Sequence, residues 1–148
     1  MVSEQEEIYQ ERILDHYEDP YHRGQCDSPT HRHQEKNPLC GDVIQIELQL
    51  DADGRIREVY FNGDGCRISQ AAASILTEHM DGKTVDEIRD FTADDMLELF
   101  GPKLSVLRQK CCLLSWKVLR SVVHSPINGQ SSDSESSTDE ASADEGSQ

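Results

Sequence analysis

The chain has 148 residues, of which 35% are hydrophobic and only 5% aromatic, and it carries a net charge of −15 with a pI of about 4.6. This length allows one domain with a mainly aliphatic core plus an appended segment, since single domains commonly take about 100–150 residues. The acidity argues against nucleic-acid binding, where basic side chains supply the affinity. No stretch reaches the ~20 apolar residues of a membrane helix, and the N-terminus has no apolar signal-peptide core, so we expect a cytoplasmic protein that binds neither nucleic acid nor a membrane.

The chain begins with a predicted helix and a long loop. In "IYQERILDHYEDP", Ile8, Tyr9, Ile13 and Tyr17 recur near helical spacing, and Pro20 ends the helix. Residues 21–38 are polar and rich in turn formers, which predicts a loop that holds at most a short edge strand.

A β-hairpin follows, in "VIQIELQLDADGRIREVYFNGDG". Apolar residues occupy every second position from Ile44 to Leu50, and "DADG" supplies the turn. In the return strand Val59 and Phe61 are in phase and Ile56 is out of phase. Such a sheet has one polar face and needs helices on the other.

The second half of the chain predicts helices only. "ISQAAASILTEHM" (residues 68–80) has an apolar stripe of helical period. Thr84 with Glu87, and Thr92 with Asp95, have the spacing of N-terminal capping boxes. The last helix is expected to begin near Leu104. Its apolar face would hold Leu107, Cys111, Leu114, Val118 and Val122.

These elements predict an α+β fold over residues 1–124, in which helices cover one face of a small antiparallel β-sheet of about three strands. Residues 125–148 contain no Lys or Arg, six acidic residues and almost no bulky apolar side chain. We therefore expect a disordered acidic, Ser-rich tail. Its Ser-acidic repeats resemble sites of acidic-directed kinases, although a solubilising tail is the simpler interpretation.

The five cysteines are Cys26, Cys40, Cys66, Cys111 and Cys112. In a reducing compartment such thiols bind metal or react more often than they form disulfides. Cys40 lies on the turn "NPLCGD" beside Asp42. Cys66 lies in "NGDGCRIS" at the start of a helix, whose unpaired N–H groups favour negative charge.

Three sulfurs (Cys40, Cys66 and Cys111) and the Asp42 carboxylate make a four-ligand set that suits tetrahedral zinc, and thiolates also bind iron–sulfur clusters. The spacing alone leaves other interpretations open. Cys111 could be a small core residue and Asp42 a turn-stabilising residue. His31 and His33 could also bind a metal, but alternate histidines in a loop are more often solvated polar groups.

Three motifs resemble those of a known family. "EKNPLCGD", "GDGCRISQAAAS" and "RQKCCLLSW" occur in the order of the three cysteine motifs of the U-type iron–sulfur cluster assembly proteins, which comprise IscU, the N-terminal domain of NifU, and SufU. The resemblance spans roughly residues 5–123. It implies a SufE/NifU-like fold.

The resemblance also implies roles for single residues. Cys40, Cys66 and Cys111 match the cysteines that ligate metal or build the cluster. Asp42 matches an aspartate that ligates zinc in some members and aids cluster release in others. Cys111 rather than Cys112 matches the third motif, because the family's Cys, two small or aliphatic residues, Leu and a small residue fit "CCLLS" from Cys111 onward.

Two departures favour SufU-like members. Lys110 stands where IscU proteins have a histidine, and "GPKLSVLRQK" lacks the IscU chaperone motif L-P-P-V-K. A protonated lysine is a poor ligand, so Asp42 is the better fourth ligand. Following the SufU motif, Arg108 would help to hold the metal site or a partner. The short span from Cys66 to Cys111 is instead closer to IscU.

The resemblance implies a protein that accepts persulfide sulfur from a pyridoxal-phosphate-dependent cysteine desulfurase through a zinc site. It then serves a downstream cluster scaffold or apo iron–sulfur proteins. Cys40, on its turn, is the expected sulfur acceptor. One alternative is a scaffold that assembles a [2Fe–2S] cluster on Cys40, Cys66 and Cys111. Another is a non-catalytic, zinc-stabilised interaction module.

Overall fold

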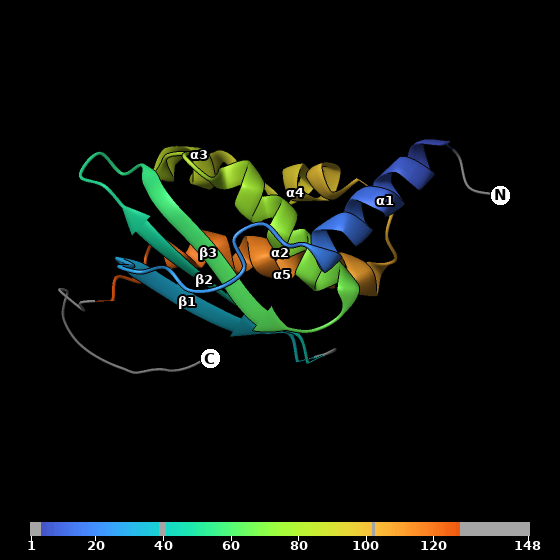
Figure 1. Cartoon of the computed structure of the whole chain (residues 1–148), viewed down its shortest axis with the longest axis horizontal. Coiled ribbons are helices and arrows are strands. Elements are labelled where there is room, and N and C mark those ends of the chain that lie inside the picture. The colour runs from blue at the N-terminus through green and yellow to red at the C-terminus, as the bar shows by residue number, and fades with distance from the viewer. Residues whose placement is uncertain (1–3, 39–40, 102, 128–148) are drawn as a thin grey trace.

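The computed structural model describes residues 4–38, 41–101 and 103–127. Within them the chain forms helices and strands in the order α, three β, four α (Figure 1). Their bounds are α1 Glu4–Glu18, β1 His31–Lys36, β2 Val43–Leu50, β3 Ile56–Asp64, α2 Arg67–Met80, α3 Val85–Asp90, α4 Ala93–Phe100 and α5 Val106–Val122. The expected tail falls almost entirely outside the described residues, as does Cys40.

The three strands form one antiparallel sheet in the order β1-β2-β3. A register shift between Gln49 and Leu50 pairs Leu50 with Ile56. Such a bulge adds one residue to a strand and so changes which face its side chains occupy. Ile56 is therefore buried together with Val59 and Phe61, although the sequence places it out of phase with them.

Helices cover one face of the sheet, as predicted. In Figure 1, α2 runs alongside β3, and α5 lies behind β1 and β2. The aliphatic stripe of α2, centred on Ala72 and Ile75, belongs to the same buried hydrophobic cluster as the strand residues Ile44, Ile46 and Phe61. Burying these side chains is the main favourable term that holds the two layers together.

The caps of the short helices follow the predicted pattern. The Thr84 and Thr92 hydroxyls each accept the backbone N–H three residues on, and the carboxylates of Glu87 and Asp95 accept the backbone N–H of the cap residue in turn. The last helix begins at Val106, with Ser105 as its N-cap, two residues later than expected.

The expectation that Leu107 belongs to the buried face of this helix is wrong. Cys111, Leu114, Val118 and Val122 are buried, but Leu107 is 53% exposed. Leu107 lies in the first turn of α5 and lines an open pocket instead of packing in the core.

Short segments of chain pair with both outer strands of the sheet. On the β3 side, Gly24 N–H donates to the Phe61 carbonyl (2.9 Å) and Phe61 N–H to the His22 carbonyl (3.1 Å). On the β1 side, Ile127 N–H donates to the Thr30 carbonyl (3.0 Å). His31 forms an isolated antiparallel bridge with Pro126.

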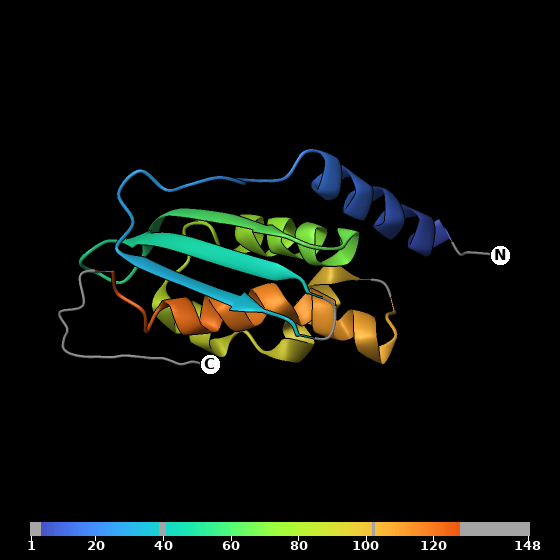
Figure 2. The same ribbon diagram turned by 90° about the horizontal axis from the view of Figure 1, so that it is seen from below.

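Helix α1 packs on α2 (Figure 2), and polar side chains of α1 bond to both α2 and α4. His16 Nδ1 lies 2.7 Å from Ser74 Oγ, and Arg12 donates to the Leu99 carbonyl (2.8 Å). Ile13 is the buried apolar residue of α1 among those whose side chains the structure describes. None of the described helices is long and apolar enough to span a bilayer.

Candidate metal centre

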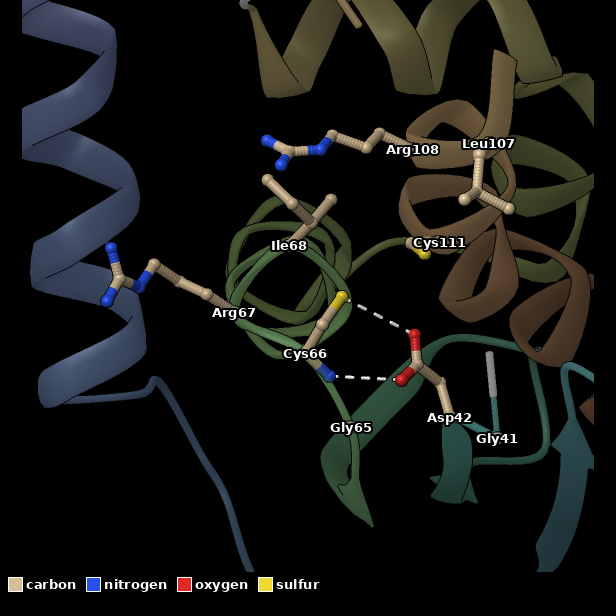
Figure 3. A pocket seen from close by; sticks show the side chains of 9 residues that line it. All are labelled: Gly41, Asp42, Gly65, Cys66, Arg67, Ile68, Leu107, Arg108 and Cys111. Atoms are coloured by element: carbon tan, nitrogen blue, oxygen red, sulfur yellow. Dashed lines mark hydrogen bonds between the residues drawn. The ribbon is translucent and has the colours of Figure 1, made fainter. Parts of the chain in front are cut away.

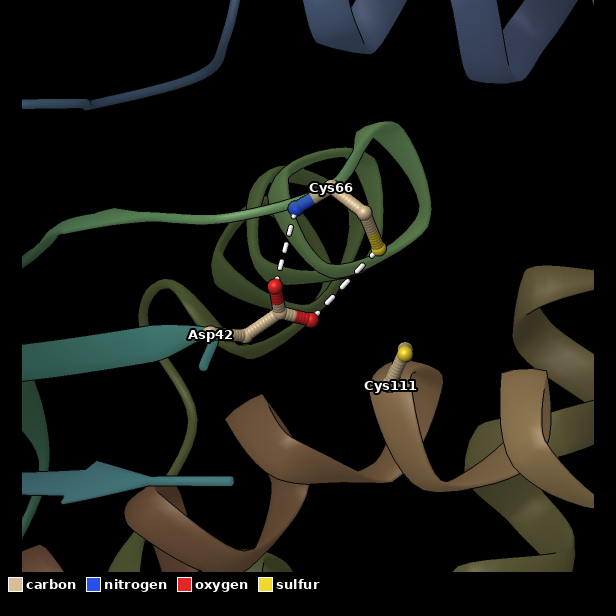
Figure 4. Close-up of side chains that lie close together, drawn as sticks. All are labelled: Asp42, Cys66 and Cys111. Atoms are coloured by element: carbon tan, nitrogen blue, oxygen red, sulfur yellow. Dashed lines mark hydrogen bonds between the residues drawn. The ribbon is translucent and has the colours of Figure 1, made fainter. Parts of the chain in front are cut away.

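Three potential ligands from distant parts of the chain meet at one end of the sheet (Figure 4). Asp42 directly precedes β2, Cys66 directly precedes α2, and Cys111 lies in α5. One ligand atom of each lies within 4.8 Å of the others. Among the described residues this is the one group of three or more such side chains so close together.

The Asp42 carboxylate is held in place by Cys66. Its Oδ1 accepts the Cys66 backbone N–H (3.0 Å), and its Oδ2 accepts the Cys66 thiol (3.5 Å), as Figure 4 shows. Asp42 is only 2% exposed. A buried carboxylate is costly unless it is hydrogen-bonded or faces a cation. These two bonds therefore fix the carboxylate beside the thiols.

Gly65 makes this approach possible. Its φ of +153° is a conformation that L side chains rarely adopt. A Cβ at this position would lie 2.5 Å from Asp42 Oδ1 and 2.7 Å from Ser69 Oγ. The contact between the carboxylate and Cys66 therefore requires Gly65, the second glycine of "GDGC".

Cys66 is the N-cap of α2. Its Sγ accepts the Ser69 backbone N–H at 3.5 Å, and the residue is exposed. The expectation that this thiol sits at a helix N-terminus is confirmed. The position makes Cys66 both accessible and oriented toward Asp42.

The two adjacent cysteines of α5 have different surroundings. Cys111 is 4% exposed and its Sγ belongs to the group with Asp42 and Cys66. Cys112 is fully buried in the hydrophobic core, and burial raises the pKa of its thiol to about 12. The structure therefore brings Cys111 to the candidate centre and leaves Cys112 in the core.

The other sequence candidates lie elsewhere. Burial raises the pKa of Cys26, whose thiol donates to Glu58 Oε1 (3.5 Å). His31 and His33 belong to β1, where His33 Nε2 lies 3.0 Å from Glu35 Oε2. Among the described residues, neither histidine joins a group of three potential ligands.

The centre opens into a pocket of about 640 Å³ (Figure 3). The pocket is lined by Arg67 and Ile68 from the start of α2 and by Leu107 and Arg108 from the first turn of α5. Of these four, the sequence motifs pointed to Arg108 alone. In Figure 3 Arg67 extends toward α1, where its guanidinium carbon lies 5.6 Å from the Tyr17 ring centre. The centre is thus reachable from solvent beside two cationic side chains.

The donor set fits a tetrahedral metal. At about 2.3 Å for Zn–S and about 2.0–2.2 Å for Zn–O, neighbouring ligand atoms lie roughly 3.6–3.8 Å apart. The spread of up to 4.8 Å among Asp42, Cys66 and Cys111 requires only small movements to reach that spacing. Asp42 supplies a hard oxygen and the cysteines supply soft sulfur, a combination that zinc accepts.

Known proteins with similar sequences and structures share this fold. Residues 8–126 match the family described as the NifU-like N terminal domain. A crystal structure of a SUF-system iron–sulfur cluster assembly scaffold protein from Fervidobacterium islandicum superposes with a TM-score of 0.66 at 28% identity, covering 79% of this chain and 97% of that one. The NifU-like N-terminal protein of Brucella abortus, 20% identical, shares the fold with the same TM-score.

Curated relatives carry two different descriptions. The iron–sulfur cluster assembly scaffold protein IscU of Streptococcus pyogenes is 30% identical over 146 residues, covering 87% of this chain and 91% of the relative. The zinc-dependent sulfurtransferase SufU of Bacillus subtilis is 32% identical over 129 residues, covering 76% and 86%. The chain therefore belongs to the NifU-like N-terminal domain family of iron–sulfur cluster assembly proteins, together with its IscU and SufU relatives.

Proposed function

We propose that this protein accepts persulfide sulfur from a pyridoxal-phosphate-dependent cysteine desulfurase in the cytoplasm and passes it toward cluster assembly. Zinc would be held by Cys40, Asp42, Cys66 and Cys111. The observation that carries the proposal is the convergence of Asp42, Cys66 and Cys111 at an open pocket. The zinc-dependent sulfurtransferase SufU relative supports it.

The transfer itself requires only a thiolate within reach of the donor. The acceptor thiolate attacks the terminal sulfur of the desulfurase Cys–S–S⁻. A new S–S bond forms as the donor S–S bond breaks, and the desulfurase cysteine leaves as a thiolate with the electron pair. The step is an exchange at sulfur, so it consumes no oxidant or reductant.

The zinc ion and the residues of the centre would have different roles in this transfer. Zinc, when bound, would keep the sulfurs ionised, and the thiolate is the nucleophilic form of cysteine. Asp42 supplies an oxygen ligand that Cys66 already orients. Cys40 is our candidate for the acceptor, because its turn lies beside Asp42 in the sequence. Its position lies outside the described residues.

The test is desulfurase turnover of cysteine with the zinc-loaded protein added to the desulfurase of its own organism. We expect strong stimulation with zinc retained. Asp42→Ala should reduce the stimulation by at least about tenfold, since even outer partners of metal ligands often contribute that much. The exposed Asp94→Ala is the matched control and should act like the parent.

Variants that each lack one of the cysteines identify the acceptor. Cys40→Ala should abolish sulfur acceptance. Normal acceptance by Cys40→Ala would move the role to Cys66 or Cys111. Absence of any stimulation by the zinc form would contradict the proposal itself.

The second candidate function is a scaffold that assembles a [2Fe–2S] cluster on Cys40, Cys66 and Cys111, with Asp42 completing or labilising it. The IscU relative favours it, and sulfur-rich sites suit iron as well as zinc. Anaerobic reconstitution with iron and sulfide distinguishes the two functions. A stable cluster absorption band that Cys111→Ala removes would support the scaffold.

A third candidate is a non-catalytic interaction module that zinc merely stabilises. It predicts that removal of zinc unfolds the domain. It also predicts that neither desulfurase stimulation nor cluster assembly is seen. Either of those two activities would exclude it.

A further inference from the structure

A second pocket lies between the end of β1 and the outer side of α5, apart from the cysteine centre. Its volume is about 300 Å³. Apolar side chains form part of its wall, and three lysines line it. Among its lining residues are Lys36, Pro38, Lys110, Leu113, Leu114 and Lys117.

The three lysines make this pocket a concentration of positive charge on an acidic protein. The chain has five lysines in all and a net charge of −15, and the other two, Lys83 and Lys103, lie elsewhere. No Asp or Glu is among the described residues that line the pocket. Within the described ranges, no ion pair joins any of the three to a carboxylate.

We propose that the acidic C-terminal segment of this same chain binds here, with its carboxylates at Lys36, Lys110 and Lys117. Residues 128–148 carry six acidic side chains, between Asp133 and Glu145, and no Lys or Arg. The pocket and the segment therefore have complementary charge. This contact does not depend on whether the thiols accept sulfur.

The chain is long enough for this contact. The segment leaves the described structure at Ile127, beside Thr30 at the start of β1, and Lys36 ends that strand. Six strand residues span about 17–20 Å at ~3.3 Å each. The six residues from 128 to Asp133 reach roughly 20 Å when extended. The chain pairs antiparallel with β1 and so leaves Ile127 heading away from Lys36. The acidic residues from Asp139 onward lie at least 12 residues beyond Ile127, which is enough chain to reverse direction and return to the pocket.

Tethering compensates for the weakness of each ion pair. Exposed ion pairs contribute little individually and are screened by salt. A segment joined covalently to its site is present there at an effective concentration on the order of millimolar. Several carboxylates can also exchange among the three lysines. We expect a dynamic but preferred contact that high salt abolishes.

The contact would place the acidic segment close to the candidate centre. Pro38 lines the pocket and immediately precedes residues 39–40, which connect to Gly41 and Asp42. Lys110 precedes Cys111 on α5, and successive helical side chains point about 100° apart. The segment would therefore bind on the neighbouring side of α5 from the cysteine centre.

Zero-length carbodiimide cross-linking of the full chain, read by mass spectrometry, tests the proposal. At low salt we expect Asp or Glu of residues 133–145 to be linked mainly to Lys36, Lys110 and Lys117, with the yield falling several-fold at high salt. Lys83 and Lys103 are internal controls. Equal yields at all five lysines, or none at any, would overturn the proposal.

Two further measurements test whether the contact forms within one molecule and whether it depends on the three lysines. Cross-linking a mixture of isotope-labelled and unlabelled chains shows whether the links form within one molecule, and mixed links would overturn the intrachain contact. Neutralising the six acidic residues (Asp→Asn, Glu→Gln) should shift the backbone amide resonances of residues 36 and 113–117. These shifts should vanish in a Lys36→Gln/Lys110→Gln/Lys117→Gln background and persist in Lys83→Gln/Lys103→Gln. Shifts that persist in the triple variant would contradict the proposal.

Discussion

At the scale of single residues, Cys111 and Cys112 show how one helical step separates two roles. Their side chains leave the helix about 100° apart. One thiol faces Asp42 and Cys66, and the other is enclosed in the core with a pKa of about 12. At neutral pH the Cys112 thiol is neutral, so it is neither a good nucleophile nor a ready metal ligand.

Alanine substitutions should separate these two roles. Cys111→Ala should lower bound zinc well below one equivalent, and it should show little loss of stability when it and the parent are both compared without zinc. Cys112→Ala should keep the zinc but lower the free energy of unfolding by about 1–2 kcal/mol, because it leaves a small cavity in the core. Zinc content by atomic spectroscopy and urea unfolding report the two effects. Loss of zinc in Cys112→Ala alone would reverse the assignment.

At the scale of elements, the contact between α1 and α2 favours an uncharged histidine, His16. Burial lowers the pKa of His16 below its ordinary value, and this effect outweighs Glu78, which raises it. The unfolded chain therefore takes up the proton more readily than the folded one. The docking of α1 is favoured above about pH 6.5, the ordinary histidine value, and is weakened as the pH falls through it.

We accordingly expect the free energy of unfolding to decrease from pH 7.5 to pH 5.5, and His16→Asn to reduce that decrease. Burial also lowers the pKa of His31 and His79, so the variant should flatten the dependence without removing it. Denaturant unfolding at several pH values measures the slope. An identical slope in His16→Asn would show that the α1 contact does not titrate.

The elements also show what the sequence could predict. The hairpin and α2 have a clear period, and the capping boxes mark α3 and α4. Strand β1 has no such period, because its half-buried positions hold His31, His33 and Glu35 in place of apolar residues. The core position of Ile56 depends on a bulge in the pairing with β2. The alternation of apolar and polar residues along the sequence does not indicate this bulge.

At the scale of the whole molecule, metal binding should be coupled to folding. The proposed ligands come from the approach to β2, the cap of α2 and the middle of α5, so one bound ion would link three separate segments. A ligand that binds only the folded state stabilises it by about 4 kcal/mol at 1,000 times its Kd.

Zinc should therefore raise the melting temperature by several degrees, and a chelator should reverse the rise. Thermal melts of the parent and of Asp42→Ala measure this difference, and the variant should lose most of the zinc response. An equal response in both proteins would place the zinc elsewhere on the chain.

The assembly of the centre could be predicted only in part. The motifs around Asp42, Cys66 and Cys111 identified the residues by resemblance, and the structure brings those three together. Spacing alone could not do so, because the approach depends on where α5 crosses the end of the sheet. The same crossing leaves Leu107 on the pocket wall, contrary to its place in the apolar stripe.

The segments that pair with the two outer strands affect how the molecule meets copies of itself. An open strand edge offers unpaired N–H and C=O groups to which another chain can add, which is a common start of aggregation. Here residues 22–24 pair with part of β3, and residues 125–127 pair with the start of β1. The protein can thus leave one end of its sheet accessible to a partner while part of each lateral edge stays unavailable for strand exchange and fibril growth.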